Sequence, residues 1–178
     1  MSGWTTYAKV DQLMFLPMQS IALASTTFVG QNLGAKQYAR TKKGVAFGVL
    51  CSCISAQLIG LVCYVFAPQL IGLFTDSAEA VDFGVRHMRT ICLFNFLLAF
   101  SHCIASVLRG AGKPLVPMLT MLVFWCALRM TYVSVAVKFV NQLTTVSWAY
   151  PITWTLSSIV FLIYFFKADW IHNFDRME

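Results

Sequence analysis

The dominant pattern along this chain is five long apolar segments separated by short polar stretches. The segments cover residues 13–29, 44–67, 90–108, 114–137 and 143–166. Arg129 is the only Asp, Glu, Lys or Arg residue within them. A helix of 24 residues is about 36 Å long, which is enough to cross a hydrocarbon core of about 30 Å with some tilt. The pattern therefore predicts an all-α integral membrane protein with five transmembrane helices.

We expect these helices to form a single transmembrane bundle over residues 1–178, with no linker and no second domain. The approximate predicted spans are 10–33, 44–67, 84–109, 114–137 and 143–166. Pro17 is expected to kink the first helix or to free one of its carbonyls, and Pro68 is expected to end the second helix.

The third predicted helix has a recognisable start. Asp76, followed three residues later by Glu79, is typical of a capping box, so the helix is expected to begin near Ser77. We expect it to continue without a break to Leu108, with its first turns on the membrane surface.

Composition supports the membrane assignment. Apolar residues make up 58% of the chain and charged residues 11%, against about 25% charged in soluble domains, and the mean hydropathy is +0.70. The net charge of +6 comes from cations between the apolar segments, which argues against nucleic-acid binding. No cysteine pair has CxxC spacing, so we expect no disulfide framework, no metal site and no cofactor. The six cysteines, all in apolar segments, are Cys51, Cys53, Cys63, Cys92, Cys103 and Cys126.

The basic residues predict the orientation in the membrane. If the five helices alternate, eight Lys and Arg residues fall on one side and four on the other. The eight are Lys36, Arg40, Lys42, Lys43, Arg109, Lys113, Lys167 and Arg176; the four are Lys9, Arg86, Arg89 and Lys138. The side with more cations is expected to be cytoplasmic, and the C-terminus lies on that side. The N-terminus then lies outside without an earlier helix, so we expect the chain to be part of a longer protein.

Several short motifs occur in an informative order. Residues 28–35 read FVGQNLGA and precede a basic loop, residues 73–76 read LFTD, and residues 108–113 read LRGAGK. Trp125 and Arg129 follow within the fourth apolar segment. Together these motifs resemble the multidrug and toxic compound extrusion (MATE) transporters along nearly the whole chain. The resemblance implies most of the C-terminal six-helix lobe of a twelve-helix transporter, without that lobe's first helix and without the N-terminal lobe.

The resemblance also implies a function. The expected activity is secondary antiport that exports organic cations or other xenobiotics across the plasma membrane, coupled to a proton or sodium gradient, by rocker-switch alternating access. The alternatives are a flippase for lipid-linked oligosaccharides of the same superfamily, or an inactive transporter fragment. HExxH, paired intramembrane aspartates and GxSxG are absent, so we do not expect an enzyme. Membrane lipid is the surrounding partner.

Two groups of residues are candidates for function. Polar residues within membrane helices avoid lipid and mark an interior or a watery cavity. On this basis the candidate cavity residues are Gln19, Ser20, Asn95, His102 and Arg129. The family motif residues, interpreted as packing and hinge positions or as substrate contacts, are Gly30, Gln31, Asn32, Gly34, Ala35, Arg109, Gly110, Gly112 and Trp125.

Two of the candidates, His102 and Arg129, leave alternatives open. Asn95 and His102 are seven residues apart and therefore share a helix face. His102 is either a hydrogen-bonded interior histidine or a group that handles protons or substrate. Arg129 is either a structural bridge or interfacial anchor, or part of the translocation path.

Carboxylates are scarce in the predicted membrane cores. No Asp or Glu occurs between Asp82 and Asp169, and we count none in the cores of the first two helices. The resemblance implies carboxylates in this lobe for sodium-coupled members, so the sequence argues against a sodium site here. It predicts that coupling depends on a carboxylate in the N-terminal lobe, which this chain does not include, with protons as the better-fitting ion.

Overall fold

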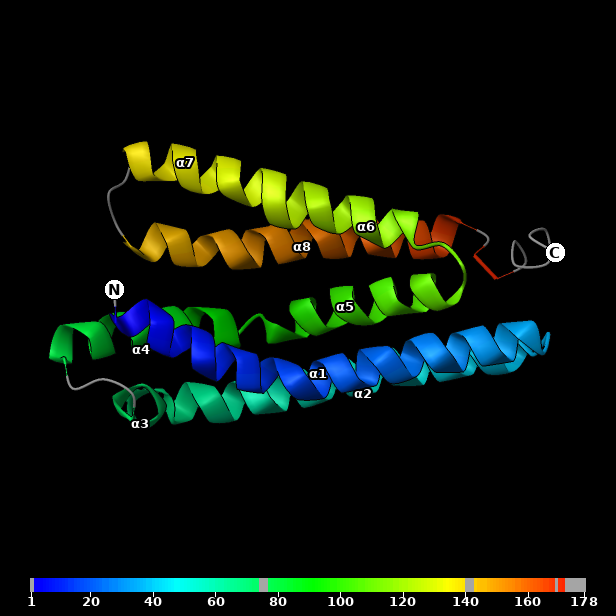
Figure 1. Cartoon of the computed structure of the whole chain (residues 1–178), viewed down its shortest axis with the longest axis horizontal. Helices are drawn as coiled ribbons and strands as arrows, with labels where there is room; N and C mark the ends of the chain where they lie inside the picture. Colours follow the sequence, from blue (N-terminus) through cyan, green and yellow to red (C-terminus); the bar gives the residue numbers. More distant parts are fainter. Residues whose placement is uncertain (1, 74–76, 140–142, 169, 172–178) are drawn as a thin grey trace.

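The computed structural model describes residues 2–73, 77–139, 143–168 and 170–171, and within these ranges the chain is almost entirely helical. The elements are α1 (Ser2–Gly34), α2 (Tyr38–Val65), α3 (Ala67–Gly72), α4 (Ala78–Cys92), α5 (Asn95–Gly110), α6 (Leu115–Met121), a π-helix η1 (Leu122–Leu128), α7 (Arg129–Phe139) and α8 (Leu143–Lys167). Helices α6, η1 and α7 follow one another without a loop and form one long rod (Figure 1).

Four segments are long and apolar enough to cross a membrane. They are Asp11–Gly34, Tyr38–Val65, Leu115–Ala136 and Val146–Lys167. The pair α4–α5 makes a fifth span if a bend of 55° is allowed. The structure therefore confirms the all-α membrane fold with up to five spans.

The two prolines singled out in the sequence occupy different positions in the helices. Pro68 lies in the first turn of α3, directly after α2 ends at Val65. Pro17 lies inside α1, which continues through it and changes direction about midway (Figure 1). The Pro17 side chain is on an exposed face of the helix.

The prediction of one unbroken helix from Ser77 to Leu108 is wrong. The helix begins as expected, with Ser77 as the extended residue before α4, but it breaks at Leu93 and Phe94. Asp76 of the predicted capping box lies outside the described residues, and Ser77 makes no side-chain capping bond.

Residues on α2 accommodate this break. A Cβ atom on Gly60 would lie 2.8 Å from the Cys92 carbonyl oxygen, so only glycine permits this close approach. Gln57 Nε2 donates a hydrogen bond of 3.4 Å to the same carbonyl. A carbonyl freed inside a membrane needs a protein donor, and the donor here comes from the neighbouring helix.

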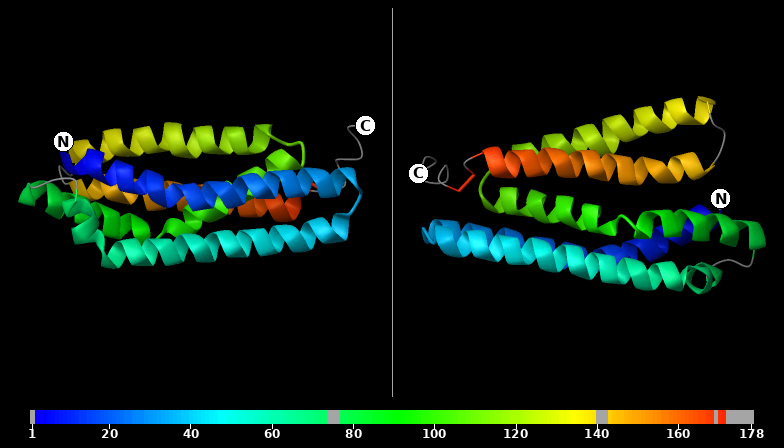
Figure 2. Two further views of the ribbon diagram at one scale, coloured as in Figure 1. Left: turned by 60° about the horizontal axis from the view of Figure 1, so that its bottom comes forward. Right: turned by 180° about the vertical axis from the view of Figure 1, so that it is seen from behind.

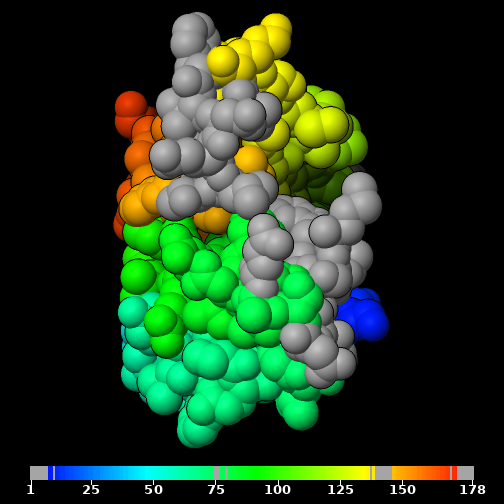
Figure 3. Space-filling model, turned by 90° about the vertical axis from the view of Figure 1, so that its left-hand side faces the viewer, coloured from blue at the N-terminus to red at the C-terminus, as the bar shows by residue number. Residues whose placement is uncertain are grey.

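The helices run up and down between two ends (Figure 1). One end holds the α1–α2 turn, the α5–α6 turn and the C-terminus of α8, and we call it the basic end. Its described cations are Lys36, Arg40, Lys42, Lys43, Arg109, Lys113 and Lys167. The opposite end holds the start of α1, α3, the start of α4, the end of α7 and the start of α8 (Figure 1, Figure 3). The predicted pairing of the first and third loops on one side is visible in this arrangement.

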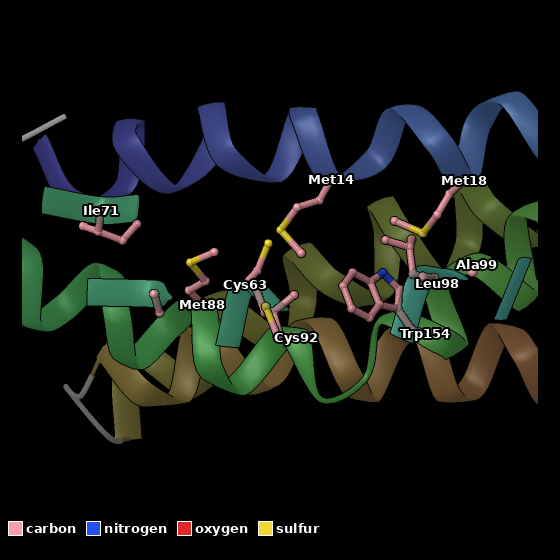
Figure 4. Packing of buried hydrophobic residues seen from close by; sticks show 12 residues of the cluster. Met14, Met18, Cys63, Ile71, Met88, Cys92, Leu98, Ala99 and Trp154 are labelled. Carbon is pink, nitrogen blue, oxygen red and sulfur yellow. The ribbon is translucent and has the colours of Figure 1, made fainter. Parts of the chain in front are cut away.

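Two clusters of buried apolar side chains form the core. One cluster fills the end opposite the basic end, where Met14, Cys63, Met88 and Cys92 direct their side chains into one region (Figure 4). The other lies toward the basic end around Val29 and Phe161. Flexible methionines and small cysteines pack the irregular space left by the α4–α5 bend.

Candidate functional site: a polar cluster between α5, α7 and α8

Buried hydroxyl groups join α5 to α8. Ser101 Oγ on α5 lies 2.9 Å from Ser158 Oγ and 3.3 Å from Ser157 Oγ. Trp125 Nε1 on η1 donates a hydrogen bond of 3.2 Å to Ser157 Oγ. Ser158 Oγ in turn lies 3.3 Å from the Leu97 carbonyl oxygen and donates to it. Polar groups from three segments are thereby satisfied without water.

Arg129 begins α7 and turns toward α8. Its Nη2 donates a hydrogen bond of 2.8 Å to Thr153 Oγ1. The Thr153 hydroxyl donates to the Ala149 carbonyl at 2.9 Å, which leaves its oxygen free to accept from the guanidinium. The Arg129 Cζ lies 4.3 Å from the centre of the Tyr150 ring and 5.8 Å from that of Trp125. Such cation–π contacts are strongest where water is excluded.

The backbone before Arg129 is unusual. Residues Leu122–Leu128 form a π-helix, which is rare and frequently marks functional sites. The wider turn carries Trp125 and leads directly into Arg129, and both side chains donate hydrogen bonds to residues of α8. Ser101, His102, Trp125, Arg129, Tyr150, Thr153, Ser157 and Ser158 together form what we call the polar cluster.

Within the polar cluster, His102 lies on the side that faces α1. Its ring lies edge-on between Phe15 at 4.7 Å and Trp125 at 5.1 Å, measured between ring centroids. Its Nε2 atom is buried without a hydrogen-bond partner in the described part of the chain. A buried polar nitrogen in this state is costly and calls for a partner such as a proton, an ion or a ligand.

The sequence analysis missed Asp11. This half-buried residue is the first of the α1 span and acts electrostatically on Tyr150 of the polar cluster and on Cys92. Helical spacing could have revealed it, because Asp11 precedes the buried Met14 and Met18 by three and seven residues and shares their face. A carboxylate thus lies at the edge of the membrane core, where the sequence analysis counted none.

The other predicted cavity residues lie apart from the polar cluster. Asn95 is buried against α2, where its Nδ2 atom would lie 3.0 Å from a Cβ on Gly60. Gln19 and Ser20 are on the exposed surface of α1. Ser20 Oγ donates to the Leu16 carbonyl of its own helix at 3.0 Å. The structure therefore brings His102 and Arg129 into one region but not Asn95, Gln19 or Ser20.

The glycine motifs lie where α1 crosses α5. A Cβ on Gly110 would lie 2.5 Å from the Thr26 carbonyl oxygen, and one on Gly30 would lie 3.5 Å from the Gly110 carbonyl oxygen. Thr26 Oγ1 donates a hydrogen bond of 3.1 Å to the Ser106 carbonyl at the same crossing. Small residues permit this close backbone approach, as is common between membrane helices.

The remaining motif residues shape the two turns at the basic end. Asn32 Nδ2 donates to the Phe28 carbonyl at 2.7 Å, and Gly112 has a φ of 74° in the α5–α6 turn, which favours glycine. Arg109 Nη2 donates a hydrogen bond of 2.7 Å to Ser106 Oγ within its own helix. Three further motif residues have exposed positions: Gln31, Gly34 and Ala35.

No metal centre accompanies the polar cluster. Among the described residues, no three His, Cys, Asp or Glu side chains come together in a way that could hold a metal ion. The cluster supplies instead a guanidinium, an imidazole, a nearby carboxylate and aromatic faces. Such groups can form hydrogen bonds and cation–π contacts, and an imidazole can exchange protons near neutral pH.

Comparison with known proteins places this architecture in a family. The family model MatE matches residues 1–135. A protein named "Probable multidrug resistance protein NorM" from Thermotoga maritima is 28% identical over 163 residues, which cover 90% of this chain and 35% of that protein. "Multidrug and toxin extrusion protein 2" from Oryctolagus cuniculus is 21% identical over 171 residues, covering 96% of this chain and 28% of that protein.

A solved structure has the same fold. The structure titled "MATE transporter ClbM in complex with Rb+" aligns with a TM-score of 0.89 and 21% sequence identity, over 99% of this chain and 41% of that one. The chain spans about a third of the length of the curated relatives named above. With a family model that matches most of its length, the chain belongs to the MatE family.

Proposed function

We propose that this chain forms part of a secondary active exporter of organic cations or other xenobiotics. Membership of the MatE family and the names of its multidrug-resistance relatives support a transport role. The observation that carries the proposal is the polar cluster, because polar and charged side chains held inside a membrane bundle mark substrate and ion pathways. The proposed location is the plasma membrane, with the C-terminus in the cytoplasm and an N-terminal lobe as the partner for alternating access.

The coupling ion is proposed to act through Asp11. The Arg129 guanidinium lies over the Tyr150 ring, with its Cζ 4.3 Å from the ring centre. Asp11 on α1 exerts an electrostatic effect on the same tyrosine, which favours a carboxylate near the polar cluster. Protonation of Asp11 would remove a negative charge near Tyr150. It would thereby change the electrostatic interaction between α1 and the α7–α8 pair. This change of charge at the edge of the membrane core is the proposed two-state element for proton coupling.

His102 is proposed to tune substrate binding rather than coupling. It lies between two aromatic rings and offers one nitrogen to a bound molecule. We therefore expect His102→Ala and Asn95→Ala to alter drug affinity or the pH profile without abolishing ion dependence.

The experiment measures ethidium efflux from cells that express the full product of the gene, under imposed proton or sodium gradients. Asp11→Asn is expected to reduce gradient-driven efflux at least about tenfold while ethidium binding persists. The matched control is Asp82→Asn, because Asp82 is exposed and forms an ion pair of 2.9 Å with Arg86 on the same helix. The control should stay within about twofold of wild type, since exposed ion pairs contribute little.

Two results would contradict the proposal. Equal efflux by Asp11→Asn and Asp82→Asn would remove Asp11 from coupling. Loss of proton-driven efflux in His102→Ala, with folding and ethidium binding intact, would assign the coupling role to His102 instead.

A further inference from the structure

On one face of the bundle α5 lies between α2 and α8 (Figure 2, right). Side chains of these helices line a long groove there. Its part near the basic end has a volume of ≈ 800 Å³ and is lined by residues of α2, α5, α8 and the segment after α8. A second hollow of ≈ 340 Å³ continues it toward the middle of the bundle. The two parts share Phe100 and Leu162 in their walls, so they adjoin along the same face and together make up the groove.

The two parts of the groove differ in polarity. The part at the basic end is bordered by the exposed side chains of Lys42 on α2 and Lys167 on α8. The inner part is lined mostly by apolar residues such as Phe96, Leu97 and Ile163. Cations therefore lie at one end of an otherwise apolar surface.

The length of the groove corresponds to one leaflet of a bilayer. Lys42 at one end and Cys53 at the other are 11 residues apart on α2, which is about 16 Å along a helix. Half of a hydrocarbon core of about 30 Å is close to this length. A partner transmembrane helix would instead be expected to contact the full thickness of the core.

Aromatic residues close the groove at the basic end. After α8 the chain turns back, and the Trp170 ring stacks on Phe165 with centroids 4.9 Å apart. Trp170 is 4% exposed and packs into the core cluster near the basic end. Tryptophan at this level is typical of the membrane–water boundary, where lipid headgroups lie.

We propose that this groove binds one anionic phospholipid. The phosphate lies between Lys42 and Lys167, and an acyl chain follows the groove past Phe100 and Leu162 to the level of Cys53. Basic pockets between membrane helices bind anionic headgroups through the same charge complementarity. The described residues that line the groove include no carboxylate, and Asp169 lies outside the described residues. This proposal does not depend on the transport function.

The test is retention of lipid by the purified chain in native mass spectrometry. The detergent-solubilised chain is mixed with equal amounts of phosphatidylglycerol and phosphatidylcholine of the same acyl composition. Phosphatidylglycerol should be retained preferentially. Lys42→Gln with Lys167→Gln should reduce that preference by roughly 30-fold, because each lysine near an anionic headgroup contributes about fivefold.

Two matched controls separate the groove from general positive charge and general bulk. Lys36→Gln with Lys43→Gln removes the same charge at the same end, outside the groove lining. It should leave the preference within about threefold, because exposed charges in detergent act weakly at a distance. Ala46→Trp fills the groove at an exposed position and should reduce retention at least about tenfold, whereas Ala24→Trp on the exposed face of α1 should not.

Several results would overturn the proposal. Equal retention of the two lipids, equal losses in the two lysine double variants, or undiminished retention in Ala46→Trp would each do so. Displacement of the lipid by millimolar glycerol 3-phosphate would show a site for free phosphate esters instead. Size-exclusion profiles and helical circular dichroism that match wild type establish that each variant is folded.

Discussion

The α1–α5 crossing and the α5–α8 interface share helix α5, but different kinds of contact hold them together. At the first, glycine backbones approach so closely that a single added carbon on Gly110 would lie 2.5 Å from a carbonyl oxygen. At the second, the Ser101 hydroxyl on α5 meets the hydroxyls of Ser157 and Ser158 on α8, and Trp125 of η1 donates to Ser157. The α1–α5 crossing thus depends on glycines that lack side chains, and the α5–α8 interface depends on polar side chains.

This difference has a physical basis. Lipid tails are as apolar as leucine, so helices in a membrane gain little from burying apolar side chains and associate through close packing or hydrogen bonds. Close backbone packing has one good geometry, so the α1–α5 crossing is expected to be rigid. A hydroxyl network can exchange partners at low cost, since such bonds contribute only about 0.6 kcal/mol each in membranes. The α5–α8 interface is therefore the better place for binding and movement.

The largest effect is expected from breaking the glycine crossing. Gly110→Ala should lower the free energy of unfolding by about 2–3 kcal/mol, because the new Cβ meets the Thr26 backbone and α1 must shift. The control is Gly34→Ala, which has nothing within 4 Å of the new carbon and should be neutral or slightly stabilising. Unfolding in increasing SDS, followed by circular dichroism, measures both. Equal midpoints for the two variants would show that the crossing is not tight.

A smaller effect is expected when the cation is removed from the polar cluster. Arg129→Ala should cost about 1–2 kcal/mol through the lost hydrogen bond to Thr153 and the lost contact with Tyr150. Arg109→Ala is the matched change of an exposed arginine that bonds within its own helix, and it should cost less than about 0.5 kcal/mol. The same SDS titration distinguishes them. If Arg109→Ala is the more damaging change, Arg129 does not join α7 to α8 in the way described.

Removal of one hydroxyl should have a modest effect. Ser101→Ala leaves Ser157 and Ser158 with their other bonds to Trp154 and Leu97 carbonyls, so about 0.5–1 kcal/mol is expected. The double change with Ser158→Ala should cost less than the sum of the single changes, because both remove the same contact. Strict additivity in this double-mutant cycle would argue against a direct Ser101–Ser158 bond.

The smallest effect is expected on the exposed face of α1. Gln19→Ala and Ser20→Ala should each change the free energy of unfolding by less than about 0.5 kcal/mol, since neither residue contacts another helix through a described hydrogen bond. Their effect on ethidium efflux is a separate measurement that tests the predicted cavity role. A loss of stability as large as that of Arg129→Ala would place these side chains in a packed interface.

Much of the architecture could be predicted from the pattern of apolar segments. Runs without charge predicted the spans, and Pro68, Gly112 and Pro114 marked turns that the structure contains. The break at Leu93 and Phe94 could not be predicted, because no proline or glycine marks it and Gly60, which permits the close approach there, lies on another helix. Asn95 and His102 share a helix face as expected, yet the bend and the neighbouring helices give them different surroundings.

The sequence by itself determined the solvent of this chain, its helical class, the alternation of its loops and its family resemblance, because these follow from composition and local order. Tertiary structure alone decided that Arg129 faces Tyr150 and Thr153, that Asp11 acts on the same tyrosine, and that α2, α5 and α8 enclose a groove with lysines at one end. These features depend on which helices lie side by side and how far each is rotated. Helices in a membrane choose neighbours through a few close contacts, and such contacts join residues far apart in the sequence.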